Sequence, residues 1–193
     1  MKSRGVAYVT YGQIGFACFL VVCVALHPGF VFKANEGGLS NYGIHIKTAF
    51  AYTLALGLPG VLSWRAVSFF DRPDPLMRRF QRFLRAYSLL ILLTLLSTYV
   101  YSLDVVLRDL HIVIGSALIV LDTVGGVWMY RVRRHVRGDA VLVTALLLGF
   151  LLAALTITGL LHILFVSQVV TSGAFAILFV RSAKSIAATP GSP

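Results

Sequence analysis

Long apolar runs, separated by short basic or turn-rich segments, dominate the pattern of this chain. A helix that crosses the hydrocarbon core of a bilayer needs about 20 mostly apolar residues. Six segments meet this requirement, at residues 6–26, 44–64, 84–103, 110–130, 140–159 and 163–180. The last two come from a stretch of 41 residues, Ala140–Val180, that contains no Asp, Glu, Lys or Arg. This stretch is too long for one span, and a turn near Gly159–His162 is expected to divide it.

The pattern predicts an all-α, polytopic membrane protein. We expect a six-transmembrane-helix bundle made of three hairpins, in a single domain over residues 1–185, with a flexible tail at 186–193. The composition agrees, because 58% of the residues are hydrophobic and only 12% are charged. Soluble domains are about 45–50% apolar and about 25% charged. These values exclude an ordinary soluble enzyme, a disordered tail and a fibrous rod.

The basic residues indicate the orientation in the membrane. Fourteen of the 17 Lys and Arg residues lie in the N-terminal segment, in the loops after the second and fourth spans, and after the sixth span. The other three are Lys33, Lys47 and Arg108. Cytoplasmic loops carry the excess of Lys and Arg, so both termini are expected to be cytoplasmic. We expect a bacterial plasma (inner) membrane. Anionic lipid headgroups at the Arg clusters, rather than nucleic acid, account for the net charge of +10.

Four of the five histidines map to the expected outer surface. They are His27, His45, His111 and His162. Three carboxylates, Glu36, Asp104 and Asp109, are expected on the same side. Imidazole and carboxylate groups bind zinc, copper or iron and exchange protons near neutral pH. No local metal-binding spacing is present, so these side chains either meet in space as a joint site or anchor the helices at the headgroups. We expect at least two of the four histidines to approach one another.

Asp122 is the most informative single residue, because it falls near the middle of the fourth span. It lies eleven residues after His111, which returns it to nearly the same helix face. A charged side chain at this depth costs at least about 2.5–3.5 kcal/mol on insertion scales. Asp122 is therefore expected to face the bundle interior, buried and hydrogen-bonded, either as a functional group or as a packing element. Candidate partners on neighbouring spans are Tyr52, Thr94, Thr98, Gln168, Thr171 and Ser172.

Two further patterns concern the helix surfaces. His45, Tyr52 and Pro59 are spaced by seven residues, so they share a face of a proline-kinked span that could line a cavity. With Asp122 and His111, the side chains of His45 and Tyr52 form a candidate ligand or proton pathway. Small residues predict close helix contacts in the fourth and sixth spans. They are Gly115, Gly125, Gly126, Ser172, Gly173 and Ala176.

Two runs carry a resemblance to known proteins. EGGLSNYGIHIKT and STYVYSLDVVLRDLHIVIG resemble segments of small bacterial six-span integral membrane proteins of uncharacterised families. The resemblance implies the topology and assigns no site. Transmembrane cytochromes b hold haem between histidines of paired helices, and His45 with His111 would be the corresponding pair. His135 stands alone near the opposite face, which leaves room for one haem at most.

Four functions are consistent with these features. The first is a small transporter, channel or ligand-sensing bundle that uses the outer His/acid cluster and Asp122. The second is an electron carrier that binds a transition metal or one haem through His27, His45, His111 or His162. The third is a lipid-modifying membrane enzyme, for which no recognisable nucleophile and no catalytic residue is found. The fourth is a non-catalytic subunit of a homo-oligomer or a membrane complex. A non-enzymatic role is favoured, and enzyme activity is left open.

Overall fold

The computed structural model describes residues 2–31, 38–70, 74–133, 136 and 138–188. Within these ranges all regular structure is helical, and six helices are long and apolar enough to cross a membrane. They are α1 (Lys2–Leu26), α4 (Ala49–Ala66), α5 (Pro75–Thr98), α6 (Val105–Val132), α7 (Asp139–Ile157) and α8 (Leu164–Ala188). A short helix α3 (Asn41–Ile44) and a 3₁₀ turn η1 (Val67–Phe70) lie beside α4. For the described residues, the prediction of an all-α chain with six helices long and apolar enough to span a membrane is confirmed.

Several helix boundaries differ from those expected. Helix α5 begins at Pro75, ahead of the apolar span expected from residue 84, because Asp74 caps it and accepts a hydrogen bond from the Leu76 amide. Helix α4 begins at Ala49, later than residue 44. Helix α8 continues to Ala188, so the first three residues of the expected tail are helical, and residues 189–193 lie outside the described part of the chain.

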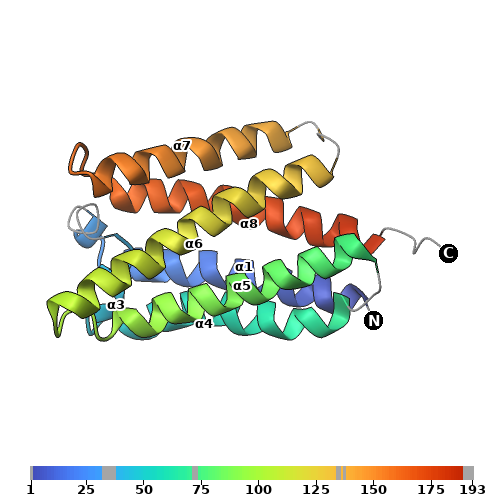
Figure 1. The fold of residues 1–193 in the computed structure, drawn as a ribbon. Coiled ribbons are helices and arrows are strands. Elements are labelled where there is room, and N and C mark those ends of the chain that lie inside the picture. Colours follow the sequence, from blue (N-terminus) through green and yellow to red (C-terminus); the bar gives the residue numbers. More distant parts are fainter. Residues whose placement is uncertain (1, 32–37, 71–73, 134–135, 137, 189–193) are drawn as a thin grey trace.

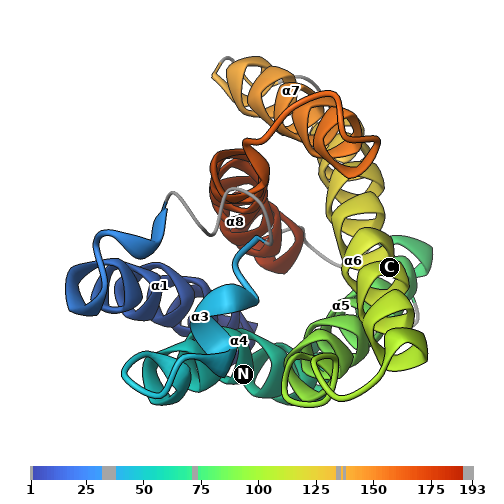
Figure 2. The same ribbon diagram turned by 90° about the vertical axis from the view of Figure 1, so that its left-hand side faces the viewer.

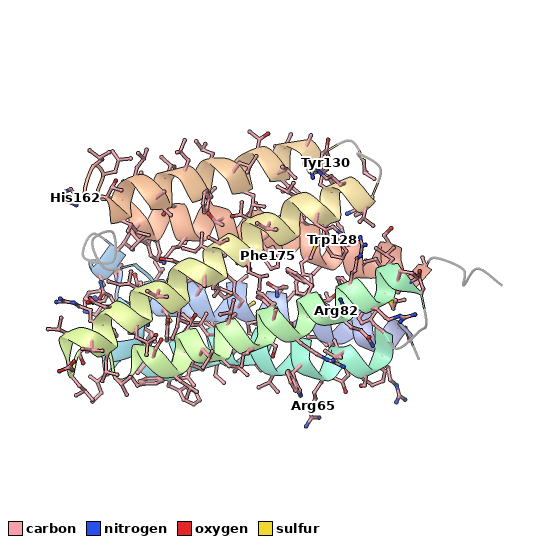
Figure 3. The ribbon with its side chains drawn as sticks, viewed as in Figure 1. Arg65, Arg82, Trp128, Tyr130, His162 and Phe175 are labelled. Carbon is pink, nitrogen blue, oxygen red and sulfur yellow. The ribbon has the colours of Figure 1, made fainter. Side chains whose placement is uncertain are left out.

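The two ends of the bundle differ in chemistry. The end that holds His27, His45 and His162 is called the histidine end here, and the opposite end, which holds Arg65 and Arg82, the arginine end. Figure 3 shows His162 and these two arginines toward opposite ends of the bundle. Helix α1 begins and helix α8 ends at the arginine end (Figure 1).

An aromatic cluster joins α5 to α8 in the arginine half of the bundle. The rings of Phe83 and Phe179 pack edge to face with centroids 5.6 Å apart, and those of Tyr87 and Phe175 lie 5.3 Å apart. Phe80, which lies on α5 like Phe83, also packs on Phe179. Such pairs contribute about 0.5–1.5 kcal/mol each beyond the burial of their area. This half of the bundle is therefore a packed core.

Helix α6 crosses the bundle diagonally. It begins beside α5 at the histidine end and ends beside α7 at the arginine end (Figure 1). Gly125 and Gly126 allow the crossing, because a Cβ at these positions would overlap the Phe83 ring and the Leu146 side chain. At the histidine end α6 diverges from α7 and α8 (Figure 2). The expected close contacts are confirmed at Gly125 and Gly126 but wrong at Gly115 and Gly173, where a Cβ would have no neighbour within 4 Å.

A buried ion-pair cluster ties α6, α7 and α8 together at the arginine end. The carboxylate of Asp139 is fully buried and lies 3.0 Å from Nη1 of Arg133 and 2.8 Å from Nη1 of Arg181. Gly138 immediately precedes α7 with φ of +88°, a conformation that glycine adopts without strain. Both arginines were expected at the membrane surface beside lipid headgroups, but they pair with Asp139.

Candidate ligand cavity

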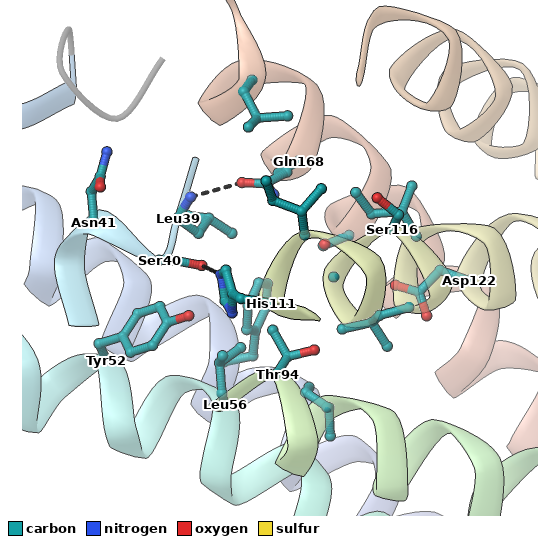
Figure 4. Close-up of a pocket in the computed structure, with 18 of the residues that line it drawn as sticks. Leu39, Ser40, Asn41, Tyr52, Leu56, Thr94, His111, Ser116, Asp122 and Gln168 are labelled. Carbon is teal, nitrogen blue, oxygen red and sulfur yellow. Dashed lines mark hydrogen bonds between the residues drawn. The ribbon is translucent and has the colours of Figure 1, made fainter. Parts of the chain in front are cut away.

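A cavity of about 400 Å³ lies in the histidine half of the bundle. It reaches from Ser40 near the histidine end to Asp122 deeper in the bundle (Figure 4). Tyr101 and Phe175 also line it. Most of its wall is apolar, formed by Phe16, Leu56, Ile91, Leu118, Ile119 and other side chains. This volume falls in the range of about 300–1,000 Å³ typical of small-molecule sites. The divergence of α6 from α8 creates the space.

Asp122 lines this cavity from the middle of α6 and is only 5% exposed. Its Oδ1 atom is buried and finds no hydrogen-bond partner among the described residues. Arg108 is the one Lys or Arg in the described lining, and it lies 14 residues away on α6, about 21 Å at about 1.5 Å per residue. The expected burial of Asp122 is confirmed, while the expected hydrogen bond is not found at Oδ1.

Within the described part of the chain, five of the six polar side chains expected to pair with Asp122 make hydrogen bonds with other groups, the exception being Ser172. Thr94 donates its hydroxyl to the carbonyl of Leu90 on its own helix at 2.8 Å. Gln168 accepts a hydrogen bond from the Leu39 amide at 2.7 Å. Asp122 is therefore left facing the cavity rather than a neighbouring helix.

His111 sits in the second turn of α6 and is 9% exposed. Its Nε2 atom lies 2.7 Å from the Ser40 hydroxyl, and its Nδ1 atom lies 2.7 Å from the Ser97 hydroxyl. The ring of Tyr101 stacks on the imidazole, with centroids 4.8 Å apart. Both ring nitrogens and one face are thus occupied by side chains of the protein.

The segment Gly38–Ile44, which contains α3, forms a cap over the cavity. Leu39 binds Gln168 of α8, Ser40 binds His111 of α6, and Asn41 accepts a hydrogen bond from the Tyr101 hydroxyl at 3.2 Å. Gly38 has φ of +73°, and a Cβ there would come within 2.7 Å of the Gln168 amide oxygen. The cap is therefore fixed to several helices at once.

The other histidines do not join His111. The rings of His27 and His45 meet edge to face with centroids 4.4 Å apart, so two of the four histidines do converge. Desolvation, followed by the nearby charges of His27 and Lys47, lowers the pKa of His45. His162 lies exposed in the turn between α7 and α8.

The remaining predicted site residues take other roles. Asp104 caps α6 by accepting a hydrogen bond from the Val106 amide at 2.7 Å. Asp109 is exposed and lies 3.9 Å from Arg108. Tyr52 lines the cavity and its hydroxyl lies 3.2 Å from that of Thr98, whereas His45 and Pro59 of the same predicted stripe are not part of the lining. Glu36 and His135 lie outside the described residues.

The arrangement does not favour a metal or haem centre. Among the residues that the structure describes, no group of three or more His, Cys, Asp or Glu side chains comes together. A His45–His111 haem pair is not favoured either, because the ring of His45 packs on His27 and Phe30 while both nitrogens of His111 bind serines.

Sequence reasoning missed the serines of the cavity. Ser40 and Ser97 were not singled out, because hydroxyl side chains are common in spanning helices and turns and no spacing marks these two. The run GGLSNYG gave a turn signal for Ser40 without indicating that it reaches His111.

Comparisons of the chain with protein-family models, with curated proteins and with solved structures gave no match. A function is therefore inferred from the geometry of the cavity.

Proposed function

We propose that this protein is a transporter or ligand-sensing bundle that binds a small amphipathic molecule in the cavity. Asp122 is the group that exchanges a proton or pairs with a cation during binding. One observation carries the proposal: a buried carboxyl group faces the cavity, and its Oδ1 has no partner among the described residues. A polar atom that is buried without a hydrogen bond costs about 1–3 kcal/mol, and an uncompensated charge costs more.

Two states of Asp122 avoid this cost. In one, the carboxyl group carries its own proton and donates it to a bound molecule. In the other, the carboxylate meets a cation or a hydrogen-bond donor that enters the cavity. Both states couple occupancy of the cavity to the charge at Asp122, which is the coupling that an ion-linked transporter or a pH-dependent sensor requires.

The lining favours a ligand that dissolves in the membrane. At the histidine end, helices α6, α7 and α8 form one side of the cavity. They contribute Ile112, Ile157 and Leu164 to its lining. Ile112 and Ile157 are 46% and 53% exposed. This apolar rim suits entry from the adjacent leaflet.

A carbodiimide experiment tests the role of Asp122. Dicyclohexylcarbodiimide reacts with protonated carboxyl groups in apolar surroundings, so we expect mass spectrometry to find the adduct on Asp122 at pH 6 and less of it as the pH rises. Asp122→Asn should abolish the adduct and keep the fold, because the amide has the same shape. Tetraphenylphosphonium, an apolar cation, should protect the wild-type protein from labelling.

Exposed Asp109 provides the control, since its carboxyl group lies outside the cavity and should gain no adduct under the same conditions. Wild-type protein without an adduct at Asp122, or with an adduct that neither pH nor tetraphenylphosphonium changes, would overturn the proposal.

We further propose that the six helices form three hairpins, with the histidine end outside the cell and both termini in the cytoplasm. The exposed arginines Arg65, Arg82, Arg85 and Arg131 then face the anionic headgroups of the inner leaflet. Ser102→Cys and Lys184→Cys, each in a Cys18→Ala/Cys23→Ala background, test this orientation. We expect an impermeant maleimide to label only the first variant in intact cells and both after lysis. Labelling of Lys184→Cys in intact cells would contradict it.

A further inference from the structure

We propose that Ser40 and His111 form a nucleophile–base pair that cleaves carboxylic esters of apolar molecules dissolved in the membrane. The distance of 2.7 Å between the Ser40 hydroxyl and Nε2 of His111 is that of a nucleophile and its general base. Both side chains line the cavity, and both are at least nine-tenths buried. This activity is separate from the role of Asp122.

The hydrogen bonds around His111 set the tautomer that a general base needs. Ser97 donates its hydroxyl proton to the carbonyl of Thr94 at 3.0 Å. The Ser97 oxygen is then an acceptor, so Nδ1 of His111 carries the proton and donates it to Ser97. Nε2 keeps a lone pair, which faces the Ser40 hydroxyl (Figure 4). Ser97 is therefore a positioning residue, equivalent in role to the third group of a catalytic triad.

The surroundings of Ser40 fit an ester with an apolar body. The cavity runs from Ser40 along the apolar wall at Leu56, Ile91 and Leu118, where an acyl or alkyl chain would lie. Tyr52 lines the same space, and its hydroxyl donates to Thr98, because Thr98 uses its own proton on the Thr94 carbonyl. Tyr52 is the candidate to stabilise the negative oxygen that forms on the ester carbonyl, and to do so its hydroxyl must turn from Thr98 toward the bound ester.

The reaction proceeds in two balanced steps. Ser40 Oγ attacks the ester carbonyl carbon while Nε2 of His111 takes the hydroxyl proton, and the tetrahedral intermediate expels the alcohol, which leaves with that proton. This gives an acyl ester on Ser40. Water then attacks the acyl group with His111 again as base, which releases the carboxylic acid and restores the Ser40 hydroxyl. Water is the only co-reactant, and no oxidant or reductant is required.

The competing explanation is structural. In this explanation, the hydrogen bond between Ser40 and His111 only holds the cap to α6, and Ser40 has no unusual reactivity. The two explanations differ in their outcome with an electrophile that reacts with activated serines. A serine that only forms a structural hydrogen bond should not react with it.

An alkyl fluorophosphonate supplies this test on the full-length protein in detergent. We expect mass spectrometry to find the phosphonyl adduct on Ser40. Ser40→Ala should abolish it, and His111→Ala should slow it by roughly 10²–10⁴-fold, the usual contribution of a general base. Ser97→Ala should slow it less and change its pH profile, because the imidazole loses its orienting partner.

Matched variants keep the result interpretable. Ser116 also lines the cavity, and Ser116→Ala should label at the wild-type rate. Asp109→Asn, at an exposed carboxylate outside the cavity lining, should label normally too. The phosphonyl adduct on Ser40 and the carbodiimide adduct on Asp122 are measured separately, so failure of one proposal is distinguishable from failure of the other. If Ser40→Ala does not fold, as judged by thermal unfolding, Ser40→Cys retains the side-chain size and should react with iodoacetamide faster than Cys18. Folded wild-type protein that gives no adduct, or an adduct at a serine other than Ser40, overturns the proposal.

Discussion

Asp139→Ala is expected to lower the free energy of unfolding by roughly 3–5 kcal/mol, the usual cost of removing one partner from a buried ion pair. Asp139 is fully buried and contacts two arginines from different helices. Its removal leaves the guanidinium of Arg133, which is 12% exposed, without a compensating charge. Arg181 is 46% exposed and can turn toward water, so the Arg133 side of the cluster accounts for most of the loss. Thermal unfolding in detergent measures the change.

A second variant and a control separate this effect from general sensitivity. Arg133→Met combined with Asp139→Ala should recover part of the stability, because the double variant removes the stranded charge as well. Asp109→Ala removes the exposed carboxylate 3.9 Å from Arg108 and should cost less than about 1 kcal/mol. An Asp139→Ala protein as stable as the Asp109→Ala protein would contradict the buried ion-pair account.

Gly149→Leu is expected to separate α7 from α8 and to cost at least the roughly 1–3 kcal/mol typical of overpacking. A Cβ at Gly149 would overlap the Thr171 hydroxyl and would lie 3.0 Å from both the Ser167 carbonyl oxygen and the Thr171 amide nitrogen. Two of these three atoms belong to the backbone, so no side-chain rotation relieves the clash. We expect a marked drop in melting temperature in detergent.

Gly173 provides the matched control in the same pair of helices. It is exposed, and a Cβ there would have no neighbour within 4 Å. Gly173→Leu should therefore leave the melting temperature nearly unchanged. A Gly173→Leu protein that is destabilised as much as Gly149→Leu would contradict the close contact of α7 with α8 at Gly149.

The six apolar helices could be predicted because the length of each apolar run can be counted in the sequence. The boundaries could be predicted less well, since they depend on local capping. Asp74 followed by Pro75 starts α5 nine residues before the apolar span expected from residue 84. The glycines show the same limit, because Gly149 and Gly173 look alike in sequence and differ only in what lies opposite them.

The cavity could be predicted only in part. Depth and helical periodicity placed Asp122 in the interior, and the structure confirms that it is buried. Which residues meet it depends on how far α6 tilts away from α8, and no local pattern encodes that angle. His111 was grouped with the other outer histidines. Its environment is determined by Ser40 and Ser97, which lie 71 and 14 residues before it in the chain.

Because α6 crosses the bundle diagonally, a small rotation about its contact at Gly125 and Gly126 would move its distant N-terminal end. Gly125 and Gly126 lie against neighbouring side chains, while Val105 at the other end is about 30 Å away at about 1.5 Å per residue. With the glycine contact as a fulcrum, a rotation of about 5° would displace the tip near Val105 by about 2.5 Å over that length. Small adjustments in the packed half of the molecule would thus be amplified at the rim of the cavity.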